Sequence, residues 1–177
     1  MSEREELNAA FVEYLNTDEI VKLRVELAEA PARTSAILGM AFVEEQLRQL
    51  LDAATHDRPG VKTFSDDRSW AFEDLTKLAF RLGLINQSIK NDITQHGTIR
   101  NRLAHSWDPN MSWDHPDIKG LIGNLTYRYE YANEVAKAEG AEMTNALRWS
   151  GSFGAIIGSL YTAINVASPP EPLDLPE

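Results

Sequence analysis

The spacing of the apolar residues constrains the fold of this chain more than any other feature. Apolar side chains recur three and four positions apart through most of the sequence, and the alternation that marks a half-buried strand is almost absent. This spacing gathers apolar side chains on one face of each successive α-helix. The sequence therefore predicts an all-α protein, a single-domain bundle of about six to seven helices.

Capping residues and helix breakers divide this pattern into elements. A first helix is expected at residues 3–14 and a second one behind the capping residue Asn16, and the others are expected at residues 33–54, 70–82, 87–104, 115–139 and 141–167. The long third helix carries Ile37 and Leu38 among its apolar residues, which we expect to lie in the core. Gly39 interrupts this helix, which indicates a close helix neighbour at that point. Gly83 is placed to end a helix in the left-handed conformation. Asp114 should cap the helix that follows it.

Two connections are long enough to matter for function. The loop at residues 56–69 contains Pro59, Gly60 and a pair of aspartates, so we expect it to be irregular and exposed. The connection at residues 106–115 contains Trp107 and Trp113, which we expect to anchor it across the core.

The helical pattern forms one domain over residues 1–167. A chain of 177 residues buries enough apolar surface to fold without metal ions or disulfides. The segment at residues 168–177 is rich in proline and acidic side chains, so we expect an extended or disordered tail.

Composition narrows the classes of function. The sequence has no cysteine, no metal-site spacing among its four histidines and no phosphate-binding loop, so we expect neither a metal ion nor a cofactor. The N-terminus is acidic where a signal peptide is basic, and no apolar run is long enough to span a bilayer, so we expect a cytoplasmic protein without membrane contact. The formal net charge of −10 opposes general binding to nucleic acids, and any such role would need a local basic patch.

The segment at residues 99–106, IRNRLAHS, carries the strongest chemical signature. Arg100 has a permanent positive charge, and His105 belongs to the one residue type that changes charge near neutral pH. Such a pair can clamp a phosphate and transfer a proton, as metal-independent cleavage of RNA requires. Five helical positions rotate by about 140°, so these side chains would converge only at a frayed helix end or across a two-fold dimer.

A structural interpretation of the same residues stays open. Glu44 and Glu45 lie together on an apolar helix, so at least one carboxylate needs a cationic partner, which we expect to be Arg100. The imidazole of a histidine at position 105 would then bond to the carbonyl groups at the end of its helix. His96 and Arg102, on the same helix, would support either arrangement.

Three sequence blocks carry a resemblance to a known family. The stretch RNRLAHSW resembles the R-N-x-x-A-H motif of HEPN domains, an all-helical superfamily. The ordered blocks ARTSAILGMAFVEEQLRQLL, FEDLTKLAFRLGLI and IRNRLAHS are similar to the mannitol operon repressor family, called MltR. The resemblance covers residues 33–125 and does not extend to the N-terminal helices, the glycine-rich last helix or the tail.

The resemblance implies an HEPN-like bundle, a homodimer and three alternative functions. The first is a transcription regulator that acts through protein partners, because the family has no standard DNA-binding motif and direct sequence-specific DNA binding is not expected. The second is a metal-independent ribonuclease of a toxin or defence system, with Arg100, Asn101 and His105 as catalytic residues at the dimer interface. The third is a catalytically silent scaffold that binds a nucleotide or a partner.

Overall fold

The computed structural model describes residues 18–126 and 142–171 of the chain. These residues form six helices and no strand: α2 (Asp18–Glu29), α3 (Ala32–Ala53), α4 (Phe72–Arg81), α5 (Gln87–His105), α6 (Pro116–Gly123) and α8 (Asn145–Val166). The all-α prediction is confirmed for this part of the chain. The helix expected at residues 3–14 and the capping residue Asn16 lie outside the described residues. None of the helices in the described ranges is both long and apolar enough to cross a membrane.

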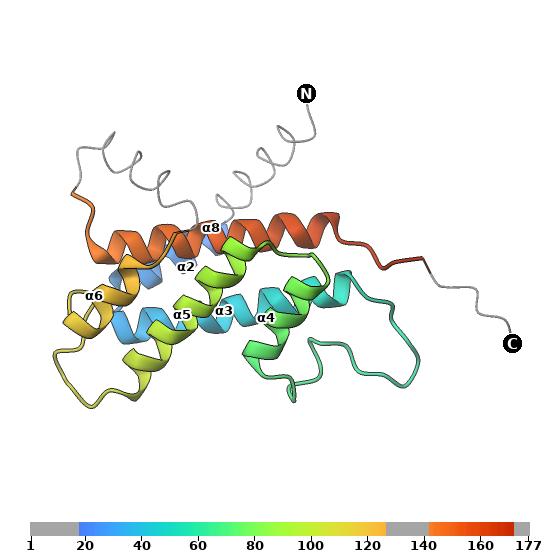
Figure 1. Ribbon diagram of the computed structural model, residues 1–177, viewed down its shortest axis with the longest axis horizontal. Helices are drawn as coiled ribbons and strands as arrows, with labels where there is room; N and C mark the ends of the chain where they lie inside the picture. Colours follow the sequence, from blue (N-terminus) through green and yellow to red (C-terminus); the bar gives the residue numbers. More distant parts are fainter. Residues whose placement is uncertain (1–17, 127–141, 172–177) are drawn as a thin grey trace, which may run out of the picture.

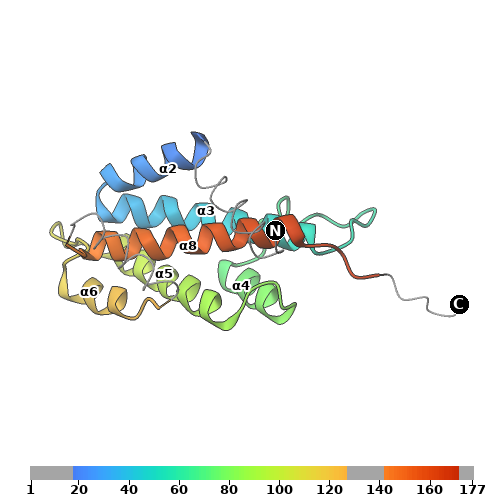
Figure 2. The same ribbon diagram turned by 90° about the horizontal axis from the view of Figure 1, so that it is seen from above.

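Helix α3 is the centre of the bundle. It packs against α2, α4, α5 and α8, while α5 also contacts α6 and α8. Figure 2 shows α2 on one side of α3, with α4, α5 and α6 on the other. The loop after α3 lies at one end of the bundle, and the segment between α5 and α6 lies at the opposite end (Figure 1). The two long connections are therefore far apart.

An aromatic stack joins α8 to α3 and to the connection before α6. The rings of Trp149 and Phe153, one turn apart on α8, lie 5.1 Å apart, and Trp113 stacks on Trp149 at 4.7 Å. A Cβ atom added to Gly39 of α3 would lie 3.0 Å from both of the α8 rings. The expected close helix neighbour of Gly39 is therefore α8, which approaches because position 39 has no side chain.

Capping chemistry explains the ends of the two helices that matter most for the site. Helix α5 begins behind Asn86, whose side-chain oxygen accepts a hydrogen bond from the backbone N–H of Ile89 at 2.9 Å. Helix α4 ends before Gly83, which has a φ of +73°, as its expected left-handed conformation requires. The helix expected at residues 33–54 differs from α3 by one residue at each end, and the helix expected at residues 87–104 differs from α5 by one residue at its C-terminal end only.

Three expectations about the elements are wrong. The helix expected at residues 115–139 ends as α6 at Gly123, and its capping residue is His115 rather than Asp114. Ile37 and Leu38 were expected in the core but are 41% and 38% exposed. The buried face of α3 contains positions 36, 40, 43 and 47, and residues 37 and 38 lie outside this face. The remainder of the expected 115–139 helix lies mostly outside the described residues.

Candidate functional site

The segment expected to carry the chemistry forms the last turns of α5. Ile99 and Leu103 are completely buried and hold this end of the helix to the core. The backbone leaves the helical conformation at Ser106, which is extended with φ −76° and ψ 135°. Helix α5 carries Arg102 and His105 in its last turn, where positive charge interacts favourably with the helix dipole.

The residues of the motif face two different sides of α5. Arg100 is half-buried, and its Nε atom is buried without a hydrogen-bond partner in the described part of the chain. Asn101, Arg102 and His105 are all exposed. Neighbouring positions three and four apart share a helix face, so these three exposed side chains form one surface. Arg100 lies on the flank of that surface, as the rotation of about 140° between positions 100 and 105 predicts.

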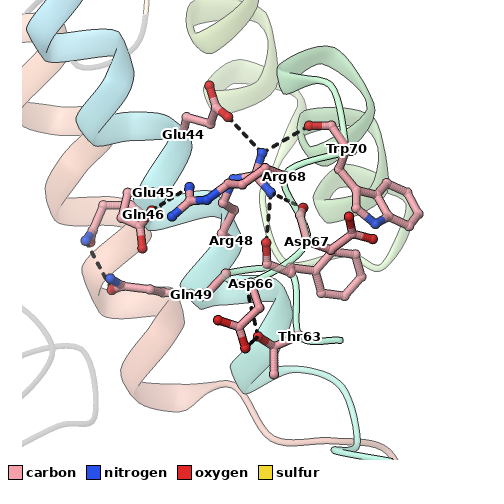
Figure 3. Close-up of polar contacts among 12 residues, drawn as sticks. Glu44, Glu45, Gln46, Arg48, Gln49, Thr63, Asp66, Asp67, Arg68 and Trp70 are labelled. Atoms are coloured by element: carbon pink, nitrogen blue, oxygen red, sulfur yellow. Dashed lines mark hydrogen bonds and ion pairs between the residues drawn. The ribbon is translucent and has the colours of Figure 1, made fainter. Parts of the chain in front are cut away.

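The expected pairing of Arg100 with Glu44 or Glu45 is wrong. Glu44 accepts a hydrogen bond from Nη2 of Arg48, one turn along α3, at 2.8 Å. Glu45 pairs with Arg68 of the following loop at 3.2 Å. Both carboxylates therefore bind cations at the loop end of the bundle (Figure 3). Arg48, four positions after Glu44 on the same helix, was a nearer candidate for the cationic partner of Glu44 than Arg100.

Arg48, which sequence reasoning did not single out, is a buried structural anchor. Its side chain is 1% exposed and donates hydrogen bonds to the backbone carbonyl groups of Phe64 and Asp67 at 2.8 Å and of Trp70 at 3.0 Å (Figure 3). Asp52 supports the same loop by accepting bonds from the backbone N–H groups at positions 64 and 65. The loop expected to be irregular is irregular, yet its backbone is tied to α3.

Arg33, in the first turn of α3, holds the opposite end of the bundle together. Its Nη2 donates to the carbonyl oxygen of Ser106 at 2.9 Å and to that of Asp108 at 3.5 Å. Helix C-termini leave carbonyl groups without partners, and a cationic side chain from a neighbouring helix satisfies them here. The sequence does not predict this contact, because Arg33 binds backbone carbonyl groups, and that of Ser106 is 73 positions away.

The two tryptophans in the connection between α5 and α6 differ in burial. Trp113 packs on the α8 aromatic rings, as expected, but Trp107 is 99% exposed, so the prediction that both anchor the loop across the core is wrong. The Arg33 clamp fixes the Ser106 carbonyl group toward the protein, and the extended backbone at that position directs the next side chain outward. Trp107 consequently faces solvent, and His105, on the last turn of α5, is exposed as well.

His96 belongs to a buried polar network instead of an open cleft. It is completely buried, and its Nε2 lies 3.0 Å from Oγ of Ser152 on α8, which lies 3.0 Å from a carboxylate oxygen of Asp92. An ionised carboxylate only accepts hydrogen bonds, so the Ser152 hydroxyl donates to Asp92 and its oxygen accepts from the Nε2–H of His96. Burial lowers the pKa of His96 to about 3, so this imidazole stays neutral at physiological pH.

Asp92 also fixes the point where the chain leaves α6. Its two carboxylate oxygens each lie 3.1 Å from the backbone nitrogen of Thr126, which donates to them. The carboxylate is 1% exposed, and hydrogen bonds of this kind offset the cost of burying its charge. Asp92, His96 and Arg100 follow one another at i,i+4 spacing along α5. The first two bind groups within the fold, whereas Arg100 forms no ion pair among the described residues.

The acidic residues around the end of α5 have partners of their own. Asp117 lies 3.9 Å from Arg102, Asp108 lies 3.4 Å from His115, and Asp114 accepts a hydrogen bond from Asn145 at 2.7 Å. No described acidic side chain forms an ion pair with Arg100. In the described ranges no three histidine or acidic side chains gather as a metal site would require.

A scan against models of protein families, a search of curated protein sequences and a search of solved structures found no match for this chain.

Proposed function

We propose that this protein is a regulatory protein of the MltR type, which controls transcription as a dimer and through contacts with other proteins. One observation carries the proposal. The three blocks that resemble this family fall on α3, on α4 and on the end of α5, and α3 packs against both of the other helices. Residues that are far apart in the sequence thus contribute to one structural unit, as expected of blocks that belong to a common fold.

The charge distribution favours protein contacts over direct binding to DNA. Sequence-specific DNA binding needs several phosphate contacts from Lys and Arg, together with an element that enters a groove. The formal charge of the chain is −10, and at the end of α5 Arg102 is paired with Asp117. Helix α5 carries three basic side chains other than histidine, Lys90, Arg100 and Arg102, over 19 residues. It is not a basic recognition helix.

Transcript measurements test this function. We expect deletion of the gene to change the transcript level of neighbouring genes, and a plasmid copy of the wild type or of the His105→Ala variant to restore it, because regulation through protein contacts needs no proton transfer. The purified protein alone should not shift DNA taken from upstream of those genes. Unchanged transcripts after deletion, or a sequence-specific shift by the protein alone, would contradict the proposal.

A metal-independent ribonuclease is the second candidate, and the state of Arg100 favours it. Neither Glu44 nor Glu45 binds this guanidinium group, and His105 is exposed at the end of the same helix. A histidine there can take the proton of a ribose 2′-hydroxyl, whose oxygen then attacks phosphorus and displaces the 5′-oxygen of the next nucleotide. The arginine would stabilise the extra negative charge on the phosphate in the transition state.

Mixing two inactive variants tests the shared site that this candidate needs. RNA is incubated without metal ions with the wild type, with Arg100→Ala, with His105→Ala, and with an equimolar mixture of the two variants after exchange of subunits. If the arginine and the histidine of a site come from different protomers, the mixture regains part of the activity and each single variant has none. Equal, absent cleavage in all samples excludes the ribonuclease. A silent scaffold instead predicts no cleavage and a lower melting temperature for both variants.

A further inference from the structure

Trp107 presents a large apolar side chain entirely to water. It is 99% exposed, whereas Trp113, six positions later in the same connection, is packed against α8. Scattered apolar side chains are normal on protein surfaces, but tryptophan is the residue type most enriched at the energetic centres of protein interfaces. The position of Trp107 next to the exposed end of α5 makes it a candidate anchor for a partner.

The backbone that carries Trp107 is held on both sides. Arg33 binds the carbonyl groups of Ser106 and Asp108, and the backbone N–H of Asp108 donates to the side-chain oxygen of Ser106 at 3.1 Å. The carboxylate of Asp108 in turn accepts from the backbone N–H of Asn110 at 2.8 Å and lies 3.4 Å from His115. A side chain on a fixed backbone loses less conformational entropy when it is bound.

The charged residues next to Trp107 in the sequence indicate which kind of partner this region would bind. The nine residues from position 99 to position 107 contain two arginines and a histidine but no acidic residue, in a chain that has 27 acidic and 17 basic residues overall. The aspartates that follow contact other side chains: Asp108 lies 3.4 Å from His115, Asp114 accepts a hydrogen bond from Asn145, and Asp117 lies 3.9 Å from Arg102 in an exposed pair. Arg100 has no acidic partner among the described residues.

We propose that the surface of Asn101, Arg102, His105 and Trp107, here called the Trp107 surface, binds an acidic segment of a different protein. Trp107 packs against an apolar residue of that segment, and the basic side chains pair with its carboxylates. The proposal rests on the regulatory function above and names the chemistry of the partner. A nucleic acid brings a charge with every nucleotide, which the single arginine of this surface and Arg100 on its flank do not balance in an acidic chain.

A second copy of the same chain fits this surface less well than an acidic partner. In a two-fold dimer the same patch faces itself, so Arg102 of one copy would lie near Arg102 of the other. Like charges placed opposite each other at an interface oppose association. Under the regulatory function proposed above, a homodimer would therefore use another face and leave the Trp107 surface open.

Peptide selection on the full chain tests this proposal. Random dodecapeptides displayed on phage are selected on the wild-type protein and counter-selected on Trp107→Ala. We expect the enriched peptides to be acidic and to contain an apolar residue. A synthetic peptide of the enriched sequence should lose about tenfold or more in affinity for Trp107→Ala, because truncation of a tryptophan anchor commonly has an effect of that size. Arg102→Glu should also weaken this peptide.

Two controls separate the surface from general effects. Trp70→Ala removes another exposed tryptophan, in the loop directly before α4, and should bind the peptide like the wild type. The melting temperature of Trp107→Ala should be unchanged, because its side chain makes almost no contact with the protein.

Three results would overturn the proposal: enriched peptides that are not acidic, equal affinity for Trp107→Ala and wild type, or a dimer that Trp107→Ala converts to a monomer in light scattering. The last result would show that a second copy covers the surface. The transcript measurements test the regulatory function independently of peptide binding. If deletion leaves transcripts unchanged while acidic peptides bind at Trp107, only the proposed function fails.

Discussion

His96 is held neutral where α5 meets α8, and this makes the stability of the fold depend on pH. Its pKa is about 3 in the folded protein and 6.5 in an exposed reference state, so the unfolded chain binds the extra proton as pH falls below 6.5. We expect this group to lower the free energy of unfolding by about 1.4 kcal/mol for each pH unit below 6.5. Urea unfolding at pH 7, 6 and 5 measures the slope.

The variant His96→Asn isolates this effect. Asparagine keeps a donor for the hydroxyl oxygen of Ser152 but does not titrate, so its stability should change less between pH 7 and pH 5 even if it is lower throughout. The other histidines for which burial is described are exposed or half-buried, and they remain in both proteins. Parallel stability curves for the two proteins would show that the buried imidazole is not the source of the slope.

Arg48 and Arg68 form a matched pair of arginines that differ in burial. Arg48→Met removes the donor of three backbone carbonyl groups and leaves Glu44 without its cation, so we expect a loss of about 3 kcal/mol in the free energy of unfolding. Arg68→Met breaks a pair in which both side chains are exposed and should cost less than about 1 kcal/mol. Faster proteolysis of the loop at residues 55–71 in the first variant alone would confirm that Arg48 holds it. Similar losses in both variants would contradict this role.

At the scale of helices, the contact between α3 and α8 depends on a single missing side chain. Gly39→Ala places a methyl group 3.0 Å from two aromatic rings, so we expect a net destabilisation of about 1–3 kcal/mol despite the better helix propensity of alanine. Gly154→Ala on α8 is the control, because an added Cβ meets nothing within 4 Å there, and it should stabilise the protein by up to about 1 kcal/mol. Thermal and urea unfolding compare the two. Equal effects at both positions would mean that α8 is not held against Gly39.

Helix positions were predictable because their signals are local. Apolar spacing and the left-handed Gly83 both act within a few residues, and the structure agrees with both of them. The end of α6 at Gly123 was missed because apolar residues continue beyond it, while the anchor that fixes the chain at Thr126 is the Asp92 carboxylate, 34 positions earlier. The face of α3 that carries Ile37 was misassigned for a similar reason, since only the placement of the neighbours decides which side is buried.

The candidate site was predictable only in part. Residues 99–106 were located correctly at the end of a helix, because the motif and the helix pattern are both local. The partners of Glu44 and Glu45, the Arg33 clamp and the exposure of Trp107 were not foreseen. The Glu45 partner, the Arg33 clamp and the exposure of Trp107 depend on groups that are brought together from distant positions, which residue type does not reveal. The Glu44 partner is different, because Arg48 lies at i,i+4 on the same helix and could have been found from the sequence.

At the scale of the whole molecule, the fold should not need its tail. The carbonyl oxygen of Pro170 lies 2.6 Å from Nε2 of His56, but this contact is exposed, and residues 168–171 have no regular structure. We expect truncation after Ala167 to cost less than about 1 kcal/mol, which corresponds to at most about 2–4 °C in melting temperature for a domain of this size. A larger decrease in a thermal melt would show that the tail belongs to the domain.

The clamp between Arg33 and Ser106 also determines when the Trp107 surface comes into existence. The two residues are 73 positions apart, so their contact closes a long loop and forms only after the helices between them have packed. A fragment that contains the α5 sequence alone therefore lacks the fixed backbone on which Trp107 is presented. During synthesis the clamp can form only after both α3 and α5 have been made, so a partner that needs Trp107 on its fixed backbone would bind the completed bundle and not an unfinished chain.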